Sequence, residues 1–293
     1  MISIVIISKD EASLDQTISD VTEQAGSLAE PWEIVVVDAS SGRLDYIRQR
    51  HEATVRWVPF EQPPGVRVSI PHQRNAGVDA AQGDIIVFTD AGCQPEPEWL
   101  KRLVAPLRQA ENMTAGGTVS TAGKKLYDIQ AEQVNSPTEF TYLRECPTLN
   151  VAFRRAAFDA VGGFDEGFAY GSDVDFAWRL NDAGYRIRYV PDAIIRHDYG
   201  TWQRQLRRSY AYGKARTRLY RKHRNRRRRM LRDDPVMVVY PLFLLGLPLT
   251  FVFPFYPALL LIPAWRNRSD GVIWVLADHL WFGMGVLAEL TGR

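Results

Sequence analysis

The stretch GDIIVFTDAG, residues 83–92, holds an unbroken apolar run and then Asp90 and Gly92. Such a run is typical of a strand that is buried on both faces of a parallel sheet. Two earlier stretches have the same character, MISIVIIS at residues 1–8 and WEIVVVDAS at residues 32–40. Polar segments with helical spacing separate the three, so the sequence predicts alternating strands and helices. The predicted fold class is α/β, with a doubly wound sheet.

Two of these predicted strands end in an aspartate, Asp38 and Asp90. In open α/β sheets the carboxyl ends of the strands face the ligand crevice, so the two carboxylates are expected to share it. An alternative is that each aspartate caps the helix that follows, which is ordinary turn chemistry. The residues alone leave both interpretations open.

Charge is distributed unevenly along the 293 residues. The chain has 36 Lys and Arg against 34 Asp and Glu, but residues 201–232 hold 14 of the basic residues and no acid, which leaves 22 basic residues elsewhere. An acidic body therefore carries a basic segment. The apolar content of 46% excludes wholesale disorder. Two cysteines cannot form a disulfide framework and no signal peptide is recognisable, so we expect residues 1–200 to be cytoplasmic and reduced.

The turn after the first strand excludes one common class of nucleotide-binding enzyme. The first strand continues into SKDEASL, which contains no glycine. A Rossmann dehydrogenase needs the GxGxxG turn there, because its glycines let a pyrophosphate approach the helix N-terminus. A dehydrogenase of that type is therefore not expected.

A second acidic segment lies further along the chain, where Asp173 and Asp175 begin a predicted helix. Acidic residues in a first helical turn are favoured by the helix dipole, which is one explanation of their presence. The other explanation is a general base held in a crevice. Glycines flank this segment, as suits a loop that approaches a bulky ligand closely.

Seven segments follow one another between residues 3 and 197: IISKDE, VVDASS, HQRNAG, FTDAGC, GGFDE, GSDVD and IIRH. Their order and spacing resemble those of the family 2 glycosyltransferases with the GT-A fold, where PTYNE, VDDGS, ARN.G, DxD, GGFDE, EDxD and a late histidine occur. The resemblance implies a Rossmann-like mixed sheet and an enzyme that transfers a sugar from a nucleotide-diphosphate sugar.

Carried over by position, the resemblance implies a set of donor-binding residues. Ser8 and Asp38 would contact the nucleotide base or ribose, with Arg74 and Asn75 nearby. Asp90 would lie at the diphosphate, directly or through a divalent cation.

The resemblance also implies the catalytic chemistry. Asp173 would be the catalytic base and His197 would lie near the diphosphate or metal, as part of a single inverting displacement. Sugar transfer needs a carboxylate to take the acceptor proton and positive charge for the departing diphosphate.

The chain departs from the family pattern at Lys9, Ala39, Gly92 and Ser172. Gly92 stands at the last position of DxD, and the loss of one carboxylate weakens or reshapes a site for a hard cation. We still expect Mg²⁺ or Mn²⁺, held by Asp90 and His197 together with diphosphate oxygens and water. Lys9 is an alternative source of positive charge.

The basic segment predicts contact with a membrane. Its aromatic residues follow one helical stripe with arginines on the other faces, so residues 201–234 are expected to form an interfacial helix on an anionic bilayer. A nucleic-acid partner is the alternative for such a stretch. The uncharged run Val236–Trp265 favours the membrane, and the basic flank places the catalytic domain, residues 1–200, on the cytoplasmic side.

Residues 235–293 are expected to form hydrophobic, membrane-associated segments. Five prolines in Val236–Trp265 predict a kinked span followed by a short re-entrant or second segment. Val272–Leu290 is either a span with a buried polar pair, from Asp278 and His279, or an interfacial helix.

The acceptor side is predicted from part of a QxxRW motif. Gln205 and Arg208 fit that motif and Ser209 replaces its tryptophan, so transfer of one sugar per visit is expected. Asn150 is assigned to the acceptor side as well. The predicted partners are a nucleotide-sugar donor, a lipid-linked or glycolipid acceptor and membrane lipids, without nucleic acid. From another functional class, the alternative is a non-catalytic binding protein on a decayed GT-A scaffold.

Overall fold

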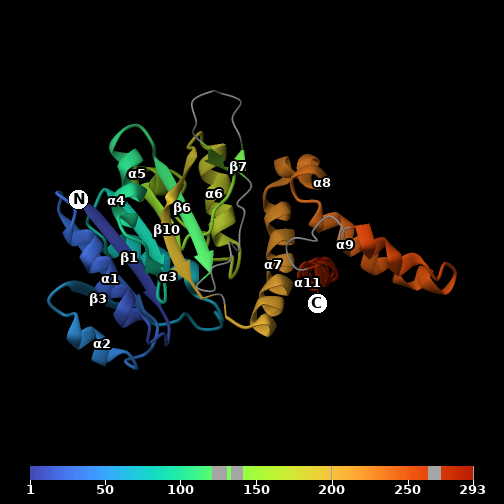
Figure 1. Cartoon of the computed structure of the whole chain (residues 1–293), viewed down its shortest axis with the longest axis horizontal. Coiled ribbons are helices and arrows are strands. Elements are labelled where there is room, and N and C mark those ends of the chain that lie inside the picture. The colour runs from blue at the N-terminus through green and yellow to red at the C-terminus, as the bar shows by residue number, and fades with distance from the viewer. Residues whose placement is uncertain (121–130, 133–140, 199, 263–271, 293) are drawn as a thin grey trace. The chain divides into compact units, whose positions relative to one another are not determined.

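The computed structural model describes residues 1–120, 131–132, 141–198, 200–262 and 272–292. The chain separates into two compact units, Met1–Asp198 and Tyr199–Arg293. Figure 1 shows the elements of both units and labels those for which there is room. The division lies close to the boundary expected at residue 200.

One mixed sheet of ten strands forms the centre of the first unit. Its parallel side has the order β3 (Val55–Pro59), β2 (Trp32–Asp38), β1 (Ile2–Ser8) and β4 (Ile85–Asp90). It continues with β9 (Asn150–Arg154), which is antiparallel to both neighbours, then β6 (Met113–Ser120), β10 (Ile187–His197), β8 (Tyr142–Leu143) and β7 (Ala131–Glu132). The short β5 (Gln94–Pro95) pairs with β10. The predicted α/β fold is confirmed.

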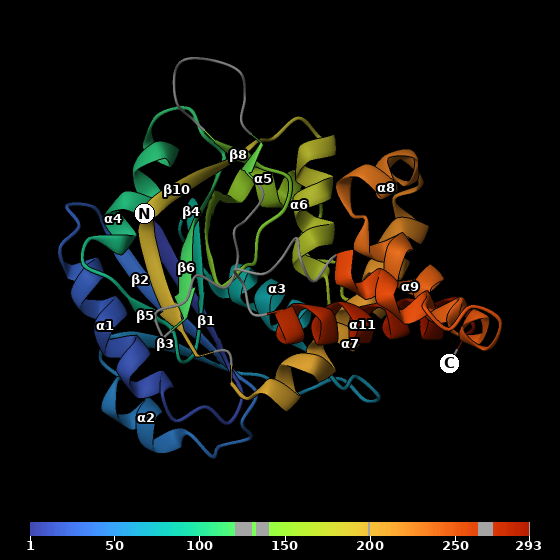
Figure 2. The same cartoon turned by 45° about the vertical axis from the view of Figure 1, so that its right-hand side comes forward.

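Helices cover both faces of this sheet (Figure 2). One core cluster packs α1 (Leu14–Gly26), α2 (Asp45–Arg50), α4 (Trp99–Val104) and η1 (Ala105–Arg108) on one face. The other cluster packs α3 (Ile70–Ala80), α5 (Arg155–Ala160) and α6 (Ser172–Asp182) on the opposite face. Burial on both faces explains why the strand sequences are continuously apolar.

An aromatic cluster fixes α6 against the sheet. The rings of Phe164 and Phe176 lie 4.5 Å apart, and Phe176 also contacts Phe153 and Phe158 at 5.7 Å. Such ring pairs stabilise a fold beyond the area they bury. The cluster therefore gives the first turn of α6, which carries Asp173, a rigid base.

The second unit is helical in its described residues. Its elements are α7 (Trp202–Lys222), η2 (Arg224–Arg229), α8 (Met230–Asp233), α9 (Val236–Leu245), η3 (Leu247–Phe251), η4 (Tyr256–Leu260) and α11 (Val272–Leu290). The single interfacial helix expected over 201–234 is therefore three elements, because the α-helix ends before His223.

The uncharged run differs from the expected kinked span. Within residues 236–262 it contains one ten-residue helix, with Pro241 inside it, and then two short 3₁₀ helices that begin at Leu247 and Tyr256 and have a proline as their second residue. Residues 263–265 of the run lie outside the described residues. Only α11, among the described helices, is long and apolar enough to cross a membrane.

Candidate active site

Three of the predicted site residues meet at one edge of the sheet. Ser8 and Asp38 are register partners at the ends of β1 and β2, and Asp90 pairs with Ile7 at the end of β4. The Asp38 carboxylate accepts hydrogen bonds from the backbone N–H and hydroxyl of Ser40. The buried hydroxyl of Ser8 has no partner among the described residues. Parallel strands thus bring two carboxylates and an unsatisfied hydroxyl together.

The start of α3 adds a buried cation at this edge. Arg74 is 5% exposed, and its Nη2 lies 3.3 Å from Oδ1 of Asp90. Its guanidinium carbon lies 6.0 Å from the centre of the Phe88 ring and 5.8 Å from that of Phe164. Aromatic faces attract a guanidinium held in this way. Its buried Nε has no partner among the described residues, so the side chain retains a donor for an anionic ligand.

Asn75, which was expected near the nucleotide, forms hydrogen bonds within the protein through both polar atoms of its amide. Its Nδ2 donates to the Phe164 carbonyl at 2.9 Å and to Glu166 at 3.0 Å, and its Oδ1 accepts from the Phe164 N–H at 2.9 Å. Both polar atoms of the amide therefore hold the GGFDE loop that precedes Asp173. In this structure Asn75 is a positioning residue.

Asp173 lies in the first turn of α6, and Gly171, the residue before this helix, has a φ of 79°. Its Oδ1 accepts from the N–H of Val174 at 2.9 Å. Burial raises the pKa of the Asp173 carboxyl above its ordinary value, the charge of Arg74 opposes that shift, and the charge of Glu145 adds to it. A raised pKa suits a group that must take and hold a proton.

Asp175, two residues after Asp173, has a different role. It is fully buried and its Oδ2 accepts from Nε of Arg179 at 2.7 Å. Arg179 in turn donates to the Gly163 carbonyl at 2.6 Å. This ion pair fastens α6 to the GGFDE loop and leaves Asp173 as the carboxylate of the motif that keeps part of its surface open.

The pH dependence of turnover follows from the environment of Asp173. Only the deprotonated form of Asp173 accepts a proton, and its pKa is raised. As the pH is lowered, activity is therefore expected to fall at a higher pH than it would with an aspartate of ordinary pKa. The measurement is the acid limb of kcat against pH. An acid limb at or below the pKa of a free aspartate would contradict this assignment.

Asp90 and His197 both contact Cys93, which lies in the turn between β4 and β5. Pairing of β5 with β10 lays this turn beside the end of β10, and Nδ1 of His197 lies 3.6 Å from Sγ of Cys93. The Cys93 N–H donates to the Asp90 carbonyl at 3.1 Å. Burial, with the Asp90 charge second, raises the pKa of the Cys93 thiol to about 12, so it remains a thiol.

The side chains at this turn are of types that bind a hard divalent cation, but they are too few to complete its coordination. Among the described residues no group of three His, Cys, Asp or Glu side chains gathers. Asp90 and His197 offer one carboxylate and one imidazole, so further oxygens would come from the donor diphosphate and water. Gly92 has a φ of 87°, and its N–H donates to the Thr17 hydroxyl at 3.0 Å. The missing DxD carboxylate thus coincides with a left-handed turn.

Asn150 does not face an acceptor, which corrects its predicted role. It is 1% exposed, and its Oδ1 accepts from the indole of Trp99 at 2.8 Å. Its Nδ2 donates to the carbonyls of Gly117 and Ala193 at 2.7 and 2.9 Å. Ala193 lies in the irregular stretch of β10 between Val190 and Ile194. Asn150 therefore closes a strand irregularity inside the core.

Asn150→Ala is expected to lower the free energy of unfolding by about 3 kcal/mol, because three buried partners lose their hydrogen bonds. Thermal unfolding measures this, and the exposed Gln109→Ala serves as the control, with an expected change within about 0.5 kcal/mol. Wild-type stability combined with lost acceptor binding would restore the acceptor assignment.

Two other acceptor-side predictions, Gln205 and Arg208, lie one turn apart on α7 of the second unit. Both are half-buried. Ser209, at the position of the motif's tryptophan, is buried and donates to Asp278. Lys9, the alternative cation, donates to Gln62 at 2.7 Å. Roles for Gln205 and Arg208 stay predictions.

Sequence comparison decides the family. The profile of "Glycosyl transferase family 2" matches residues 3–163, which is more than half of the chain and includes Asp38, Arg74 and Asp90. A second profile, "Glycosyl transferase family group 2", matches residues 130–287.

The chain belongs to glycosyl transferase family 2.

This family 2 glycosyltransferase is similar to several characterised proteins. A pre-mycofactocin glycosyltransferase of Mycobacterium tuberculosis is 31% identical over 199 residues, which is 61% of this chain and 40% of that protein. An N-acetylglucosaminyl-diphospho-decaprenol L-rhamnosyltransferase of the same species is 53% identical over 45 residues, 15% of each chain. The chain thus spans well under two thirds of the length of these relatives.

A solved structure supports the GT-A fold of this glycosyltransferase. A mannosyltransferase from Pyrobaculum calidifontis, in complex with GDP-Man and Mn²⁺, has a TM-score of 0.68 at 17% identity and covers 100% of this chain and 87% of that one. The chain therefore has the GT-A fold.

Proposed function

We propose that this glycosyltransferase moves one sugar from a nucleotide-diphosphate sugar to a lipid-linked acceptor at the cytoplasmic face of a membrane, with inversion at the anomeric carbon. The observation that carries the chemistry is the placement of Arg74. Its guanidinium lies 3.3 Å from the strand-end carboxylate of Asp90, and its positive charge lowers the otherwise raised pKa of Asp173. A base and a cation are thus held in one site.

In the proposed step, the Asp173 carboxylate takes the proton from the acceptor hydroxyl. The acceptor oxygen forms its bond to the anomeric carbon as the bond from that carbon to the diphosphate breaks, and the electron pair leaves with the diphosphate oxygen. Arg74 supplies positive charge beside that leaving group. One displacement from the face opposite the leaving group inverts the configuration.

A divalent cation held by Asp90 and His197 would add positive charge at the diphosphate. The Mn²⁺ in the similar mannosyltransferase supports this proposal. The remaining residues act without it: Ser8 and Asp38 lie where a nucleotide would be oriented, and Asn75 holds the loop before the base.

The acceptor class is supported by two findings. One relative is named for transfer to a diphospho-decaprenol, a lipid-linked diphosphate. The second unit exposes large apolar side chains next to a run of arginines, a combination that suits an anionic membrane surface. The 14 basic residues of the segment 201–232 support the cytoplasmic side.

The test of this function is a transfer assay with UDP-, GDP- and dTDP-sugars. Polyprenyl-diphosphate glycans in liposomes are compared with the same glycans without lipid, and the anomer of the product is determined by NMR. Transfer to the lipid-linked acceptor with inverted configuration is expected. Equal transfer to the lipid-free glycan would contradict the acceptor class, and a retained configuration would contradict the mechanism.

Removal of divalent cations is expected to lower activity, and Asp90→Ala is expected to lower it further, because Asp90 is the one carboxylate left in the DxD segment. The assay is turnover in chelator followed by titration with Mn²⁺ or Mg²⁺. The wild-type enzyme should recover at a lower cation concentration than the variant. Full activity in chelator would leave Arg74 and Lys9 as the sources of charge.

A further inference from the structure

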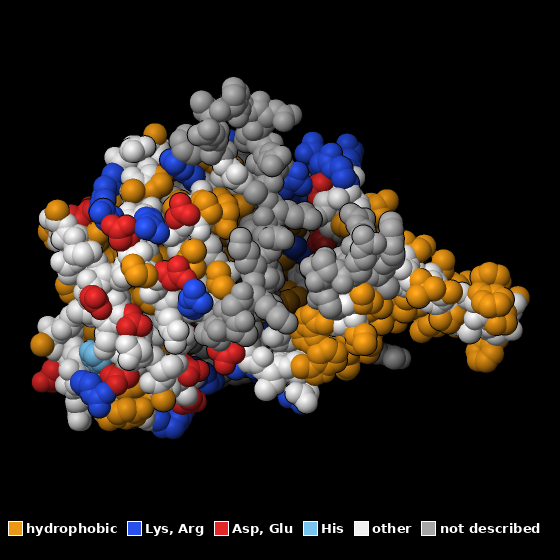
Figure 3. Space-filling model, in the orientation of Figure 1, with side chains coloured by type: hydrophobic (Ala, Val, Ile, Leu, Met, Phe, Trp, Pro, Cys, Tyr) orange, Lys and Arg blue, Asp and Glu red, His pale blue; other side chains and the backbone are white. Residues whose placement is uncertain are grey.

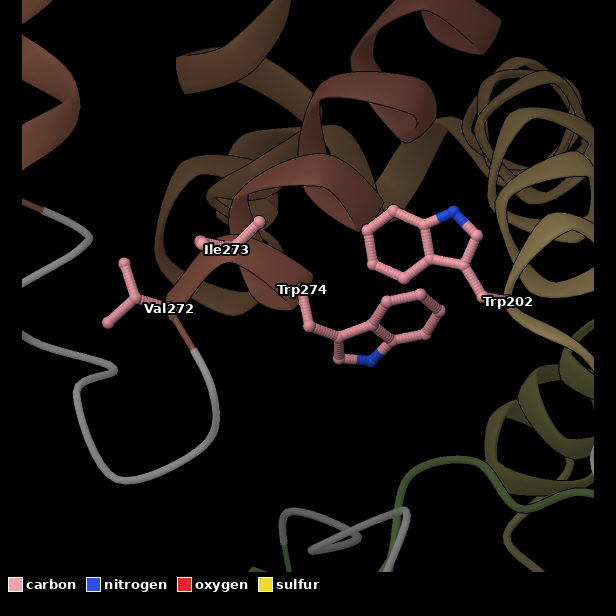
Figure 4. Close-up of a pocket in the computed structure, with 4 residues that line it drawn as sticks. All are labelled: Trp202, Val272, Ile273 and Trp274. Carbon is pink, nitrogen blue, oxygen red and sulfur yellow. The ribbon is translucent and has the colours of Figure 1, made fainter.

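Helices α7 and α11 contact each other along their lengths and run in the same direction. The rings of Trp202 and Trp274 lie 4.4 Å apart at the first turns, where they line an open apolar pocket with Val272 and Ile273 (Figure 4). Midway, Ser209 donates to Asp278, and at the last turns Arg221 lies 3.1 Å from Glu289, measured from Nη1 to Oε1.

Glycines bring the two helix backbones into close contact. A Cβ atom on Gly213 would collide with the Phe282 carbonyl, and one on Gly285 would collide with the Tyr210 carbonyl. Close approach of this kind needs residues without a side chain. Because the contact extends over the whole of α11, the two helices must lie at similar depths in any membrane.

The composition of α7 is incompatible with the bilayer core. Eight Lys and Arg residues are spread over its length, from Arg204 to Lys222. Two of them, Lys214 and Arg216, belong to its middle turns. If α11 crossed the bilayer, these two would lie near its centre, where a charge is most costly and snorkelling to an interface is hardest. The pairing of α11 with α7 is therefore incompatible with a membrane-spanning α11.

The polar groups of α11 have partners inside the unit. Asp278 accepts from Ser209, and Glu289 lies 2.9 Å from Arg218, measured from Oε1 to Nε. His279 Nδ1 lies 3.0 Å from the hydroxyl of Tyr240 on α9. The opposite side of α11 exposes apolar residues, Ile273, Trp281 and Met284.

The uncharged run forms a hairpin with an exposed apolar tip. Tyr256 folds back onto α9, where its ring stacks 5.3 Å from that of Phe243 and its hydroxyl donates to the Phe243 carbonyl at 3.0 Å. Between these two residues the chain exposes Phe251 by 94%, Val252 by 85% and Phe255 by 74%. Figure 3 shows this apolar end and, separately, a cluster of Lys and Arg side chains where η2 and α8 lie.

We infer that the second unit is a one-leaflet anchor for an anionic phospholipid bilayer, in which α7 and α11 lie in the plane of the interface and the 243–256 hairpin enters the hydrocarbon. The cations of α7 and η2 then lie at the anionic headgroups. Helix α9 has ten residues and is about 15 Å long, half of the bilayer core, so the hairpin enters one leaflet. Of the two forms expected for Val272–Leu290, the interfacial helix is the one that fits.

This inference rests on the membrane association in the proposed function and not on sugar transfer. Depth measurements on the full chain in phosphatidylcholine and phosphatidylglycerol liposomes test it. Nitroxide labels are placed on Ile273→Cys, Trp281→Cys and Ala288→Cys, one face of α11, and on Phe251→Cys. The wild-type chain, whose Cys93 and Cys146 are buried, gives the background labelling.

We expect similar depths for the three α11 labels and a greater depth for the label at Phe251. A crossing helix would instead place the labels at Ile273 and Ala288 near opposite headgroup layers, about 22 Å apart at 1.5 Å per residue, with Trp281 deepest. An impermeant maleimide should label Thr291→Cys and Leu231→Cys from the same side of the vesicle. Opposite sides, or the depth profile of a crossing helix, would overturn this inference and leave the proposed function intact.

A matched pair of substitutions tests the tip. Phe251→Asp is expected to weaken partition into these liposomes by about 10-fold or more, because it places a charge in the hydrocarbon. Leu231→Asp, at a residue that is 63% exposed and lies outside the hairpin, should have a much smaller effect. Equal effects of the two substitutions would exclude the hairpin as the part that inserts into the bilayer. If the wild-type chain did not bind liposomes, both the membrane anchor and the membrane-bound acceptor would be overturned.

Discussion

Asp173→Asn is expected to reduce turnover by about 10²- to 10⁴-fold, because an amide cannot accept the acceptor proton. Donor affinity should change little, since the donor-binding edge is formed by Ser8, Asp38, Arg74 and Asp90. The fold should also persist, because the buried ion pair that fastens α6 belongs to Asp175. The measurement is single-turnover transfer beside calorimetric titration with the donor.

The control for this prediction is Asp159→Asn, an exposed aspartate on α5, which should leave turnover unchanged. If the Asp173 variant transferred sugar at the wild-type rate, the base would have to be sought elsewhere. A variant that lost donor binding together with turnover would assign Asp173 to the donor instead.

Arg74→Met is expected to lower kcat/KM by about 10- to 100-fold, because hydrogen bonds to charged groups contribute about 1.5–3 kcal/mol each. It should also move the acid limb of the pH profile to higher pH, because the Arg74 charge lowers the pKa of Asp173. Two measurable quantities therefore change together. Steady-state kinetics over a range of pH values records both.

Arg74→Lys separates charge from geometry. It should restore the position of the acid limb, since the positive charge returns, but only part of kcat/KM, since the planar fork is lost. Arg48→Met, on the exposed face of α2, is the control. Unchanged kinetics in Arg74→Met would show that the buried guanidinium serves the fold alone.

The sheet and its donor edge could be predicted because the signals are local. Continuous apolar runs mark parallel strands, and the residue at the end of each strand lies at the shared edge whatever the rest of the chain does. Asp38 and Asp90 follow from that rule. The position of Asp173 in a first helical turn is equally local, since it depends on a glycine before the helix and an apolar face within it.

Contacts between distant parts of the chain could not be predicted in this way. Asn150 has the same polarity whether it binds an acceptor or closes a strand irregularity, and only its contacts with Trp99, Gly117 and Ala193 decide between the two. The clamp from Asn75 to Phe164 joins residues 89 positions apart. The pairing of α7 with α11 depends on glycines whose importance appears only when the helices meet.

Three consecutive residues of α3 reach three separate segments. Gln73 donates to the carbonyls of Ser8 and Val37 in the orientation that satisfies its amide, Arg74 lies beside Asp90, and Asn75 holds the GGFDE loop. Successive helical residues differ in direction by about 100°, so a one-residue insertion or deletion before them would redirect all three at once. Natural variation in chain length should therefore be absorbed in the loop of residues 60–69, and donor preference should change by substitution around α3 without any change in its register.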